Sequence, residues 1–262
     1  MMLGRWRKAG LMVPTLMTLA LLPVLVGLGT WQWQRKIWKE ELISTIEQRR
    51  TAEPVSYADA LAKAASPEAV TYLHVTVTGA FDHGEERHVY APRNQGPGWN
   101  VYTLFRPVDG LRPLFVNRGW VPERLKDPAS RSEGQVTPPV TVVGLARLPE
   151  VKGMFTPDND LKGNRWYSRD TDAMRWGAAG PPTADQLATM RLEVFAPFSI
   201  DADAKPENPG GWPKGGTTEI RLSNSHLQYV VTWYGLALTL VGVFVVFARQ
   251  RLAALQDQPA QS

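Results

Sequence analysis

Apolar residues are concentrated in two long stretches near the ends of the chain, whereas the middle is polar with short alternating segments. No residue from Ala9 to Thr30 is charged, and a helix of that length reaches roughly 33 Å, enough to cross a bilayer core of about 30 Å. From Leu222 to Ala248 there is again no Asp, Glu, Lys or Arg, and the part from Val230 onward is long enough to span. The pattern predicts two transmembrane helices.

Basic residues flank the two stretches on the sides nearest the chain ends. Arg5, Arg7 and Lys8 precede the first stretch, and Arg249 and Arg251 follow the second. By the positive-inside rule both termini then lie in the cytoplasm and the long segment between the spans is extracytoplasmic. A basic tail this short is not a mitochondrial transit peptide, which favours a bacterial inner membrane with a periplasmic main domain.

The expected organisation has five parts. It comprises a cytoplasmic tail (1–10), a transmembrane helix (11–30), an extracytoplasmic β-rich domain (31–225), a second transmembrane helix (226–248) and a cytoplasmic tail (249–262). A cleaved signal peptide is the alternative for the first apolar stretch, since Gly27 and Gly29 form a loose small-x-small cleavage site.

The middle of the chain begins with helical patterns and then changes period. Residues 32–50 continue the first helix, and residues 54–62 predict a short helix with Ser56 as its cap. In residues 72–81 apolar and polar positions alternate, as in a half-buried strand, and His74 falls on the polar, surface-facing side.

Further strands follow at short intervals. The same alternation recurs, with HG, GPG and DG as turn signals between segments, in residues 85–93, 100–108, 112–122 and 140–148. Residues 183–190 predict a helix, 192–200 another strand, and 205–216 a Gly/Pro-rich loop. The fold class predicted is membrane α+β: two transmembrane helices flank an antiparallel barrel or sandwich with short helices.

Composition and motifs exclude several functions. The chain has no cysteine, and its net charge of +4 comes from scattered residues, so neither thiolate chemistry nor nucleic-acid binding is expected. Phosphate-loop, zinc-protease and dinucleotide motifs are absent from the sequence. A membrane-anchored hydrolase is disfavoured because no nucleophile with a base partner is evident.

Two polar clusters in the middle segment contain side chains of the kinds that bind metals. DHGEERH (82–88) offers two histidines and three carboxylates, but its HG is placed at a hairpin turn, where side chains are solvated. PDNDLKGNRW (157–166) is acidic enough for a cation, but its spacing does not match an EF-hand. Neither cluster predicts a metal centre.

The outer membrane boundary carries a more unusual constellation. His226 lies about 35 Å of helix before Arg249, at the outer interface. Residues at helical spacing share its face, and an equivalent set lies at matching depth on the first helix: Tyr229, Val230 and Trp233, and Trp31, Arg35 and Trp38. Imidazole ligates haem iron, flat rings pack a macrocycle and arginine pairs with propionates.

The alternative interpretation of these residues is structural. Trp and Tyr gather at membrane interfaces as anchors without any ligand. On the second helix, small residues that suit close helix packing form a stripe: Thr232, Gly235, Thr239 and Gly242. Geometry alone favours the anchoring belt. Against it stands the placement of these aromatic residues at the outer side, since a belt normally marks both interfaces and Trp6 is the one Trp or Tyr residue at the cytoplasmic side.

Three ordered motifs resemble a known family. LGTWQWQRKIWKEELI (28–43), VNRGWVP (116–122) and HLQYVVTWYGLAL (226–238), together with FTPDND and NRWYSRD within 155–170, resemble signature stretches of the Surfeit locus family of cytochrome c oxidase assembly factors. The resemblance implies a membrane protein without enzymatic activity that binds haem a and aids its insertion into the catalytic subunit of a haem–copper oxidase. The partners it implies are that subunit, the lipid bilayer and haem a synthase.

The resemblance also implies site residues. The histidine of the last motif is the suspected haem-iron ligand and corresponds to His226, with Trp31 as a second contact. Tyr229 and Trp233 would line the haem between the two spans, and Arg35 or Arg221 would lie near the propionates.

The motif VNRGWVP supports a second function. Gly119 within a strand indicates a bulge or a close backbone approach, and Arg118 then faces either a partner or solvent. In this alternative the protein is a scaffold that grips the oxidase subunit through the β domain, with Arg118 and Trp120 as partner-binding residues, and does not bind haem.

Overall fold

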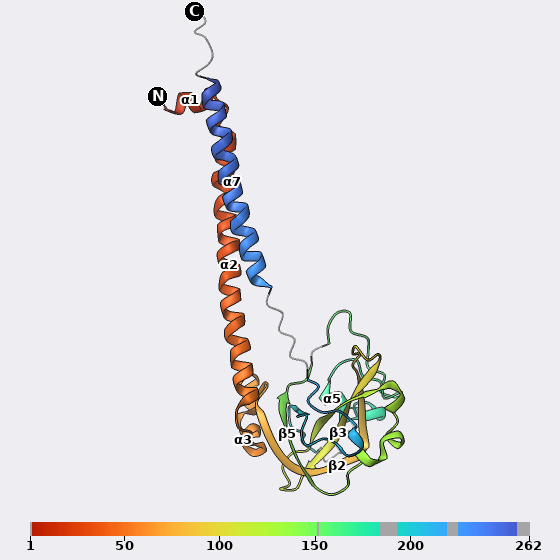
Figure 1. The fold of residues 1–262 in the computed structure, drawn as a ribbon. Coiled ribbons are helices and arrows are strands. Elements are labelled where there is room, and N and C mark those ends of the chain that lie inside the picture. Colours follow the sequence, from red (N-terminus) through yellow and green to blue (C-terminus); the bar gives the residue numbers. More distant parts are fainter. Residues whose placement is uncertain (1, 151, 184–192, 219–224, 256–262) are drawn as a thin grey trace, which may run out of the picture. The chain divides into compact units, whose positions relative to one another are not determined.

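The computed structural model describes residues 2–150, 152–183, 193–218 and 225–255 (Figure 1). The chain divides into a helical unit, Met1–Thr45 with Arg221–Ser262, and a β unit, Ile46–Ile220. The expected helix over 183–190 lies, apart from Thr183, outside the described residues.

Two long helices confirm the predicted membrane spans. Helix α2 covers Met12–Thr51 and α7 covers His226–Ala254, and both are long and apolar enough to cross a bilayer. A short helix α1 (Met2–Lys8) precedes α2, and Gly10 at φ +69° breaks the helix between them. The continuation of the first helix over residues 32–50 is also confirmed.

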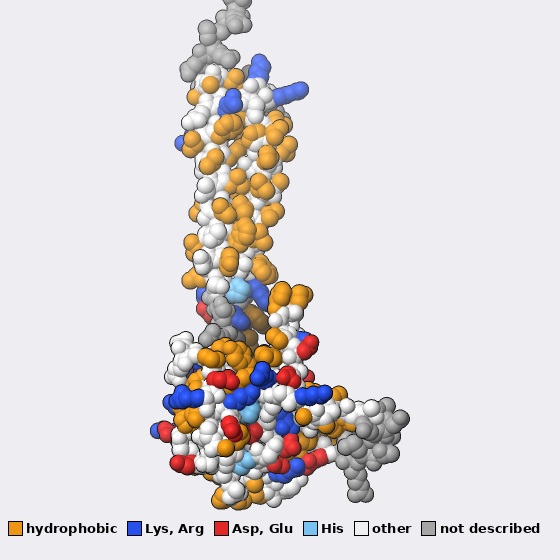
Figure 2. All heavy atoms as spheres, turned by 90° about the vertical axis from the view of Figure 1, so that its right-hand side faces the viewer, with side chains coloured by type: hydrophobic (Ala, Val, Ile, Leu, Met, Phe, Trp, Pro, Cys, Tyr) orange, Lys and Arg blue, Asp and Glu red, His pale blue; other side chains and the backbone are white. Residues whose placement is uncertain are grey.

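The two long helices pack through a coiled-coil-like seam. Their less exposed positions alternate at spacings of three and four residues: Thr18, Leu22, Leu25, Gly29 and Gln32 on α2, and His226, Val230, Trp233, Ala237 and Leu240 on α7. This spacing keeps one narrow face of each helix against the other. The remaining apolar side chains point outward, as lipid-facing residues must, and cover the helical unit in Figure 2.

The two helices approach each other closely at Gly29 of α2, and not at the predicted Gly235 and Gly242 of α7. A Cβ atom on Gly29 would lie 3.0 Å from the Tyr234 ring, and the Tyr234 hydroxyl is 3.0 Å from Thr30 Oγ1. Gly235 and Gly242 have open space where a Cβ would be. The predicted small-residue stripe is therefore exposed, because it lies off the heptad seam.

The β unit is a closed five-stranded barrel with a short additional strand. The strands are β1 (Val55–Ser56), β2 (His74–Tyr90), β3 (Gly98–Pro107), β4 (Leu114–Pro122), β5 (Val140–Arg147) and β6 (Ser199–Ala202). The barrel order is β2-β3-β4-β6-β5, and β5 pairs back with β2. The β4–β6 and β1–β2 pairs are parallel and the others antiparallel. Of the two predicted architectures, the barrel is confirmed.

Short helical segments connect the strands. They are α3 (Tyr57–Ala62), η1 (Lys63–Ala65), α4 (Pro67–Val70), η2 (Glu123–Leu125), η3 (Pro128–Gly134), α5 (Thr171–Met174), η4 (Gly177–Ala179) and η5 (Pro209–Gly211). The predicted cap of α3 is confirmed, since the Ser56 hydroxyl accepts the Asp59 N–H at 3.1 Å.

The alternating residues of the strands fill the barrel. Val75, Val77, Phe105, Val116 and Ile200 are buried in one apolar cluster. A second cluster lies where the segment around Trp166 and Met174 covers the other side of β3 and β4. Because β4 is covered on both faces, all its residues are buried, which removes the polar–apolar contrast that marks a half-buried strand.

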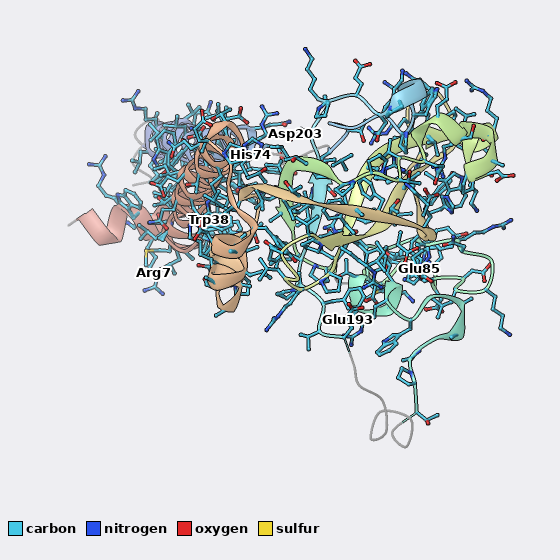
Figure 3. All side chains as sticks on the ribbon, turned by 90° about the horizontal axis from the view of Figure 1, so that it is seen from below. Arg7, Trp38, His74, Glu85, Glu193 and Asp203 are labelled. Carbon is cyan, nitrogen blue, oxygen red and sulfur yellow. The ribbon has the colours of Figure 1, made fainter. Side chains whose placement is uncertain are left out.

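Three local predictions for the β unit are wrong. His83 and Gly84 do not form a hairpin turn, because β2 runs through them with a register shift between Asp82 and Glu86. The strand expected at 192–200 begins only at Ser199. His74 is not a surface residue, since its ring bonds Ala52 O and Asp203 Oδ2, each at 2.8 Å (Figure 3).

Candidate functional site

The candidate site lies at the end of the helical hairpin where α7 begins. His226 is the first residue of α7 and occupies a half-buried seam position. Its Nδ1 atom lies 2.7 Å from Gln32 Oε1 on α2. The seam thus brings a histidine and a glutamine, 194 residues apart in sequence, into one polar contact between two apolar helices.

This hydrogen bond determines what the imidazole can do. In the neutral tautomer whose Nδ1 carries the proton, His226 donates to the amide oxygen of Gln32, and its Nε2 lone pair remains available. Within the described part of the chain, Gln32 is the one hydrogen-bond partner of this ring. A histidine that ligates a metal commonly donates its other N–H in this manner, which fixes the ring orientation and the tautomer.

The aromatic residues around His226 lie in two different environments. Trp233 shares the seam with His226, as expected, and is half-buried. Trp31 and Tyr229 each expose 51% of their surface, one position away from the seam residues Gln32 and Val230. Tyr229, three residues after His226, lies at the exposed edge of this face, because the seam runs through positions 226, 230 and 233.

Of the two arginines predicted for the site, only Arg35 on α2 lies within the described residues. The Arg35 guanidinium stacks over the Trp38 ring at 4.4 Å, and Lys36 Nζ lies 5.4 Å from the Trp33 ring centroid. Lys36 also pairs with Glu40 at 2.8 Å. Arg35 is exposed, so its guanidinium can reach an anionic group at the helix surface. Arg221, the other arginine expected here, lies outside the described residues.

The two helices leave little space between them next to His226. The His226–Gln32 contact occupies the seam, and Tyr234 packs against Gly29 and Thr30 one turn away on α2. A flat macrocycle therefore does not fit between the spans at this level. Exposed rings and the free imidazole nitrogen instead suit a ligand that lies against the outer face of the hairpin.

Arg118 and Trp120, expected to contact a partner from the β unit, are buried. They are 1% and 2% exposed, and the Trp120 indole N–H donates to Ala91 O at 2.8 Å. The expectation that Arg118 faces a partner or solvent is wrong. The predicted bulge is confirmed: Gly119 has φ +128°, and a Cβ there would lie 1.9 Å from Lys214 O of the packed loop.

Arg118 belongs to a buried ionic cluster that sequence reasoning missed. Glu86 accepts two N–H bonds from Arg131, at 2.5 and 3.2 Å, and its Oε1 is 3.8 Å from Arg118 Nη1. Burial lowers the pKa of Arg118 to about 10, although Glu86 opposes this effect. Burial alone would raise the pKa of Glu86, but the adjacent His88 and Arg131 lower it to about 2. The cluster is structural in character, since all three side chains are almost fully buried.

Gln32 is the site residue that sequence reasoning did not select. A polar residue three positions after Gly29 and seven after Leu25 continues the seam of α2, and that spacing is visible in the sequence. The aromatic residues of this segment favoured Trp31, Arg35 and Trp38 as the predicted face of α2. These three residues lie one position away from the seam.

Comparison with known proteins identifies relatives over most of the chain. A model of the SURF1 family matches residues 19–238. Surfeit locus protein 1 of Takifugu rubripes is 36% identical over 80% of this chain and 86% of the relative. The protein of the same name from Homo sapiens is 36% identical over 84% of this chain and 72% of the relative. A SURF1-like protein of Monosiga brevicollis is 37% identical over 87% and 84%, respectively.

Proposed function

The chain belongs to the SURF1 family, and from that premise we propose that it is an assembly factor for a haem–copper terminal oxidase that binds haem a and aids its insertion into the catalytic subunit. It would carry out no reaction of its own. Support comes from the family motifs and from the chemistry of the polar end of the helical hairpin.

The observation that carries the haem proposal is the hydrogen bond between His226 Nδ1 and Gln32 Oε1 at 2.7 Å. It orients an imidazole at the apolar surface of the hairpin and leaves Nε2 available for iron. An anchoring belt explains exposed Trp and Tyr residues, but it does not require a histidine clamped between the two helices. The same arrangement suits a transient ligand, because one axial ligand on an open face permits release.

The ligand would rest on the outer face of the hairpin. His226 would supply the iron ligand, Trp31 and Tyr229 would offer exposed rings to the macrocycle, and Arg35 would pair with a propionate. Trp233 packs in the seam and would support the position of His226 instead of lining the ligand. Haem contributes the iron and the flat apolar ring, and the protein contributes orientation and shielding from water.

The proposed location is a bacterial inner membrane, with both termini cytoplasmic and the β unit in the periplasm. Basic residues in α1 and in the last turn of α7, namely Arg5, Arg7, Lys8 and Arg251, support this orientation. The oxidase catalytic subunit and haem a synthase would then be reached within the same bilayer.

The test is the visible spectrum and the extracted haem of the full-length protein, purified in mild detergent from cells that make haem a. We expect a Soret band and haem a in the wild type. His226→Ala should lose the band, and Gln32→Ala should shift it or weaken binding because the ring loses its orienting acceptor. Gln228→Ala, an exposed position on the same helix end, is the matched control. A colourless wild type, or unchanged spectra in His226→Ala, would refute the haem site.

A scaffold role through the β unit is the second candidate, and one observation favours it. Met154 and Phe155 expose 92% and 94% of their surfaces on adjacent positions of one loop. Large apolar side chains that project into solvent are typical of interaction sites. Co-purification of oxidase subunits with a Met154→Ser, Phe155→Ser protein measures this role separately from haem. Unchanged recovery would count against these two residues as the contact.

A further inference from the structure

A polar cavity of about 220 Å³ opens on the β unit and takes no part in the function proposed above. Its wall includes side chains from β3, β5 and β6 and from the segments after β2 and β5: Arg93, Asn100, Tyr102, Arg147, Arg169 and Asp201. Most barrel positions are apolar, so three guanidinium groups around one cavity need a physical explanation.

Asp201 already has its hydrogen-bonding capacity filled. Its Oδ1 accepts from Asn117 Nδ2 at 3.0 Å and from the Tyr102 hydroxyl at 3.3 Å. Its Oδ2 accepts from Arg147 Nη1 at 3.1 Å and from the Thr218 hydroxyl at 2.8 Å. A carboxylate offers about four acceptor sites, so Asp201 holds the wall together and has no free acceptor for a cation.

The charges of Arg147 and Arg169 are less fully compensated by the described residues than the charge of Asp201 is. Arg169 donates through Nε and Nη2 to Leu148 O, a neutral carbonyl, at 3.2 and 3.1 Å. Arg147 uses one N–H for Asp201 and stacks over the Tyr72 ring at 4.8 Å. Its other N–H groups have no hydrogen bond among the described residues. Asp201 is the one carboxylate among the described residues that line the cavity, whereas Glu150, which accepts the Arg169 backbone N–H at 3.5 Å, lies outside the lining. The lining therefore keeps a net positive charge.

Asn100 provides an independent indication of a ligand. Its Oδ1 is buried without a hydrogen-bond partner, and in the described part of the chain its amide nitrogen has none either. Unpartnered polar atoms are costly in a folded protein and commonly mark a missing partner. The Oδ1 atom is an acceptor and needs a donor, which the P–OH of a protonated phosphate or the hydroxyl of a glycerol headgroup supplies. The amide NH₂ group of the same side chain can donate to an oxyanion that Arg147 also binds.

We propose that this cavity binds a phosphate group through Arg147, Arg169 and Asn100. The volume is below the 300–1,000 Å³ typical of pockets for drug-sized ligands, so it suits a single small anionic group. Arginine forks match the oxygens of phosphate in a bidentate manner. The source is either free phosphate or a lipid headgroup.

The test uses the full-length protein in non-ionic detergent, titrated with inorganic phosphate and with glycerophosphoglycerol, the water-soluble headgroup of phosphatidylglycerol. Binding is read by calorimetry at constant ionic strength. Asn100→Ala removes no described hydrogen bond and should fold normally, and we expect it to weaken binding several-fold. Arg147→Met should weaken binding roughly tenfold or more. Arg106→Gln, which removes an exposed arginine paired with Glu193, is the charge-matched control and should bind as wild type.

Free phosphate and a lipid headgroup as the natural ligand predict different binding results. Tighter binding of the headgroup than of inorganic phosphate, with phosphatidylglycerol lost from the Asn100→Ala protein on purification, assigns the cavity to a lipid. Tighter binding of inorganic phosphate assigns it to the free anion. Absence of binding for both probes, or binding that is equal in the wild type, Asn100→Ala and Arg147→Met proteins, overturns the proposal. The haem spectrum is unaffected by either outcome, so the two proposals fail independently.

Discussion

Replacing Glu86 with glutamine tests the energetic role of the buried ionic cluster. Glu86 is 4% exposed, and the side chains of Arg118 and Arg131 are 1% exposed. The carboxylate is the only acidic group among the described residues within 4 Å of either guanidinium. In the variant, two buried cations face a neutral amide.

The magnitude follows from the pKa of Glu86, which falls from 4.5 to about 2 on folding. Each pKa unit corresponds to about 1.4 kcal/mol, so the ionised form contributes about 3 kcal/mol to folding. Because the folded pKa is the lower one, this contribution is complete above about pH 4.5 and is lost as the pH falls toward 2. Breaking a buried ion pair costs about 3–5 kcal/mol, which agrees with that value.

The assay is pulse proteolysis of the full-length protein in detergent across a urea series, with cleavage of the β unit followed by immunoblot. We expect Glu86→Gln to lower the unfolding free energy by about 3–5 kcal/mol at pH 7, and the difference from wild type to narrow to less than half near pH 3. The control Glu193→Gln breaks an exposed pair with Arg106 and should cost at most about 1 kcal/mol. A loss below about 1 kcal/mol for Glu86→Gln, or a loss that does not change with pH, would refute the reasoning.

Two other substitutions test the confirmed local predictions with the same assay. Gly119→Ala should destabilise the β unit by more than about 2 kcal/mol, because φ is +128° and the new Cβ would lie 1.9 Å from Lys214 O; a stability equal to wild type would mean that the loop is not packed there. Ser56→Ala should cost about 1 kcal/mol through loss of the cap on Asp59 N–H, and no loss would show that another group satisfies that donor.

The membrane spans and most strands were predictable because each is determined by its own residues. An uncharged run of bilayer length and a period of two need no information from distant parts of the chain. The HG dipeptide at 83–84 predicted a turn that does not form, because turn signals are local. The strand β2 continues through it since the residues on both sides, Gly79–Asp82 and Glu86–Tyr90, pair with β3. Pairing partners far away in sequence decided the outcome there.

The buried charges could not be predicted for a related reason. A run such as DHGEERH is ordinarily solvated, and only a cationic partner makes burial of Glu86 tolerable. That partner, Arg131, lies 45 residues further along the chain. No periodicity in the sequence indicates that these two residues meet, and the same holds for His74 and Asp203, which are 129 residues apart.

The seam between the two helices coincides with some of the residues selected from the sequence and not with others, although the haem site itself stays a prediction. On α2 the seam passes through Gln32 and not Trp31, and on α7 through Val230 and not Tyr229. The seam residues hold the hairpin together, whereas the rings of Trp31 and Tyr229 are exposed. In the proposed function these exposed rings would contact the ligand. His226 would take part in both packing and ligand binding, since its Nδ1 contacts Gln32 and its Nε2 has no hydrogen bond among the described residues.

This division distinguishes a haem site from an anchoring belt. If the aromatic residues served only as membrane anchors, loss of Gln32 would alter helix packing and nothing else, since a belt does not depend on the orientation of an imidazole. If His226 ligates iron, Gln32→Ala retains the ligand but releases its tautomer and ring angle, so haem binding weakens while the hairpin remains folded. The contrast between Gln32→Ala and His226→Ala is thus more informative than either variant alone, because only an iron ligand makes the glutamine matter through the histidine.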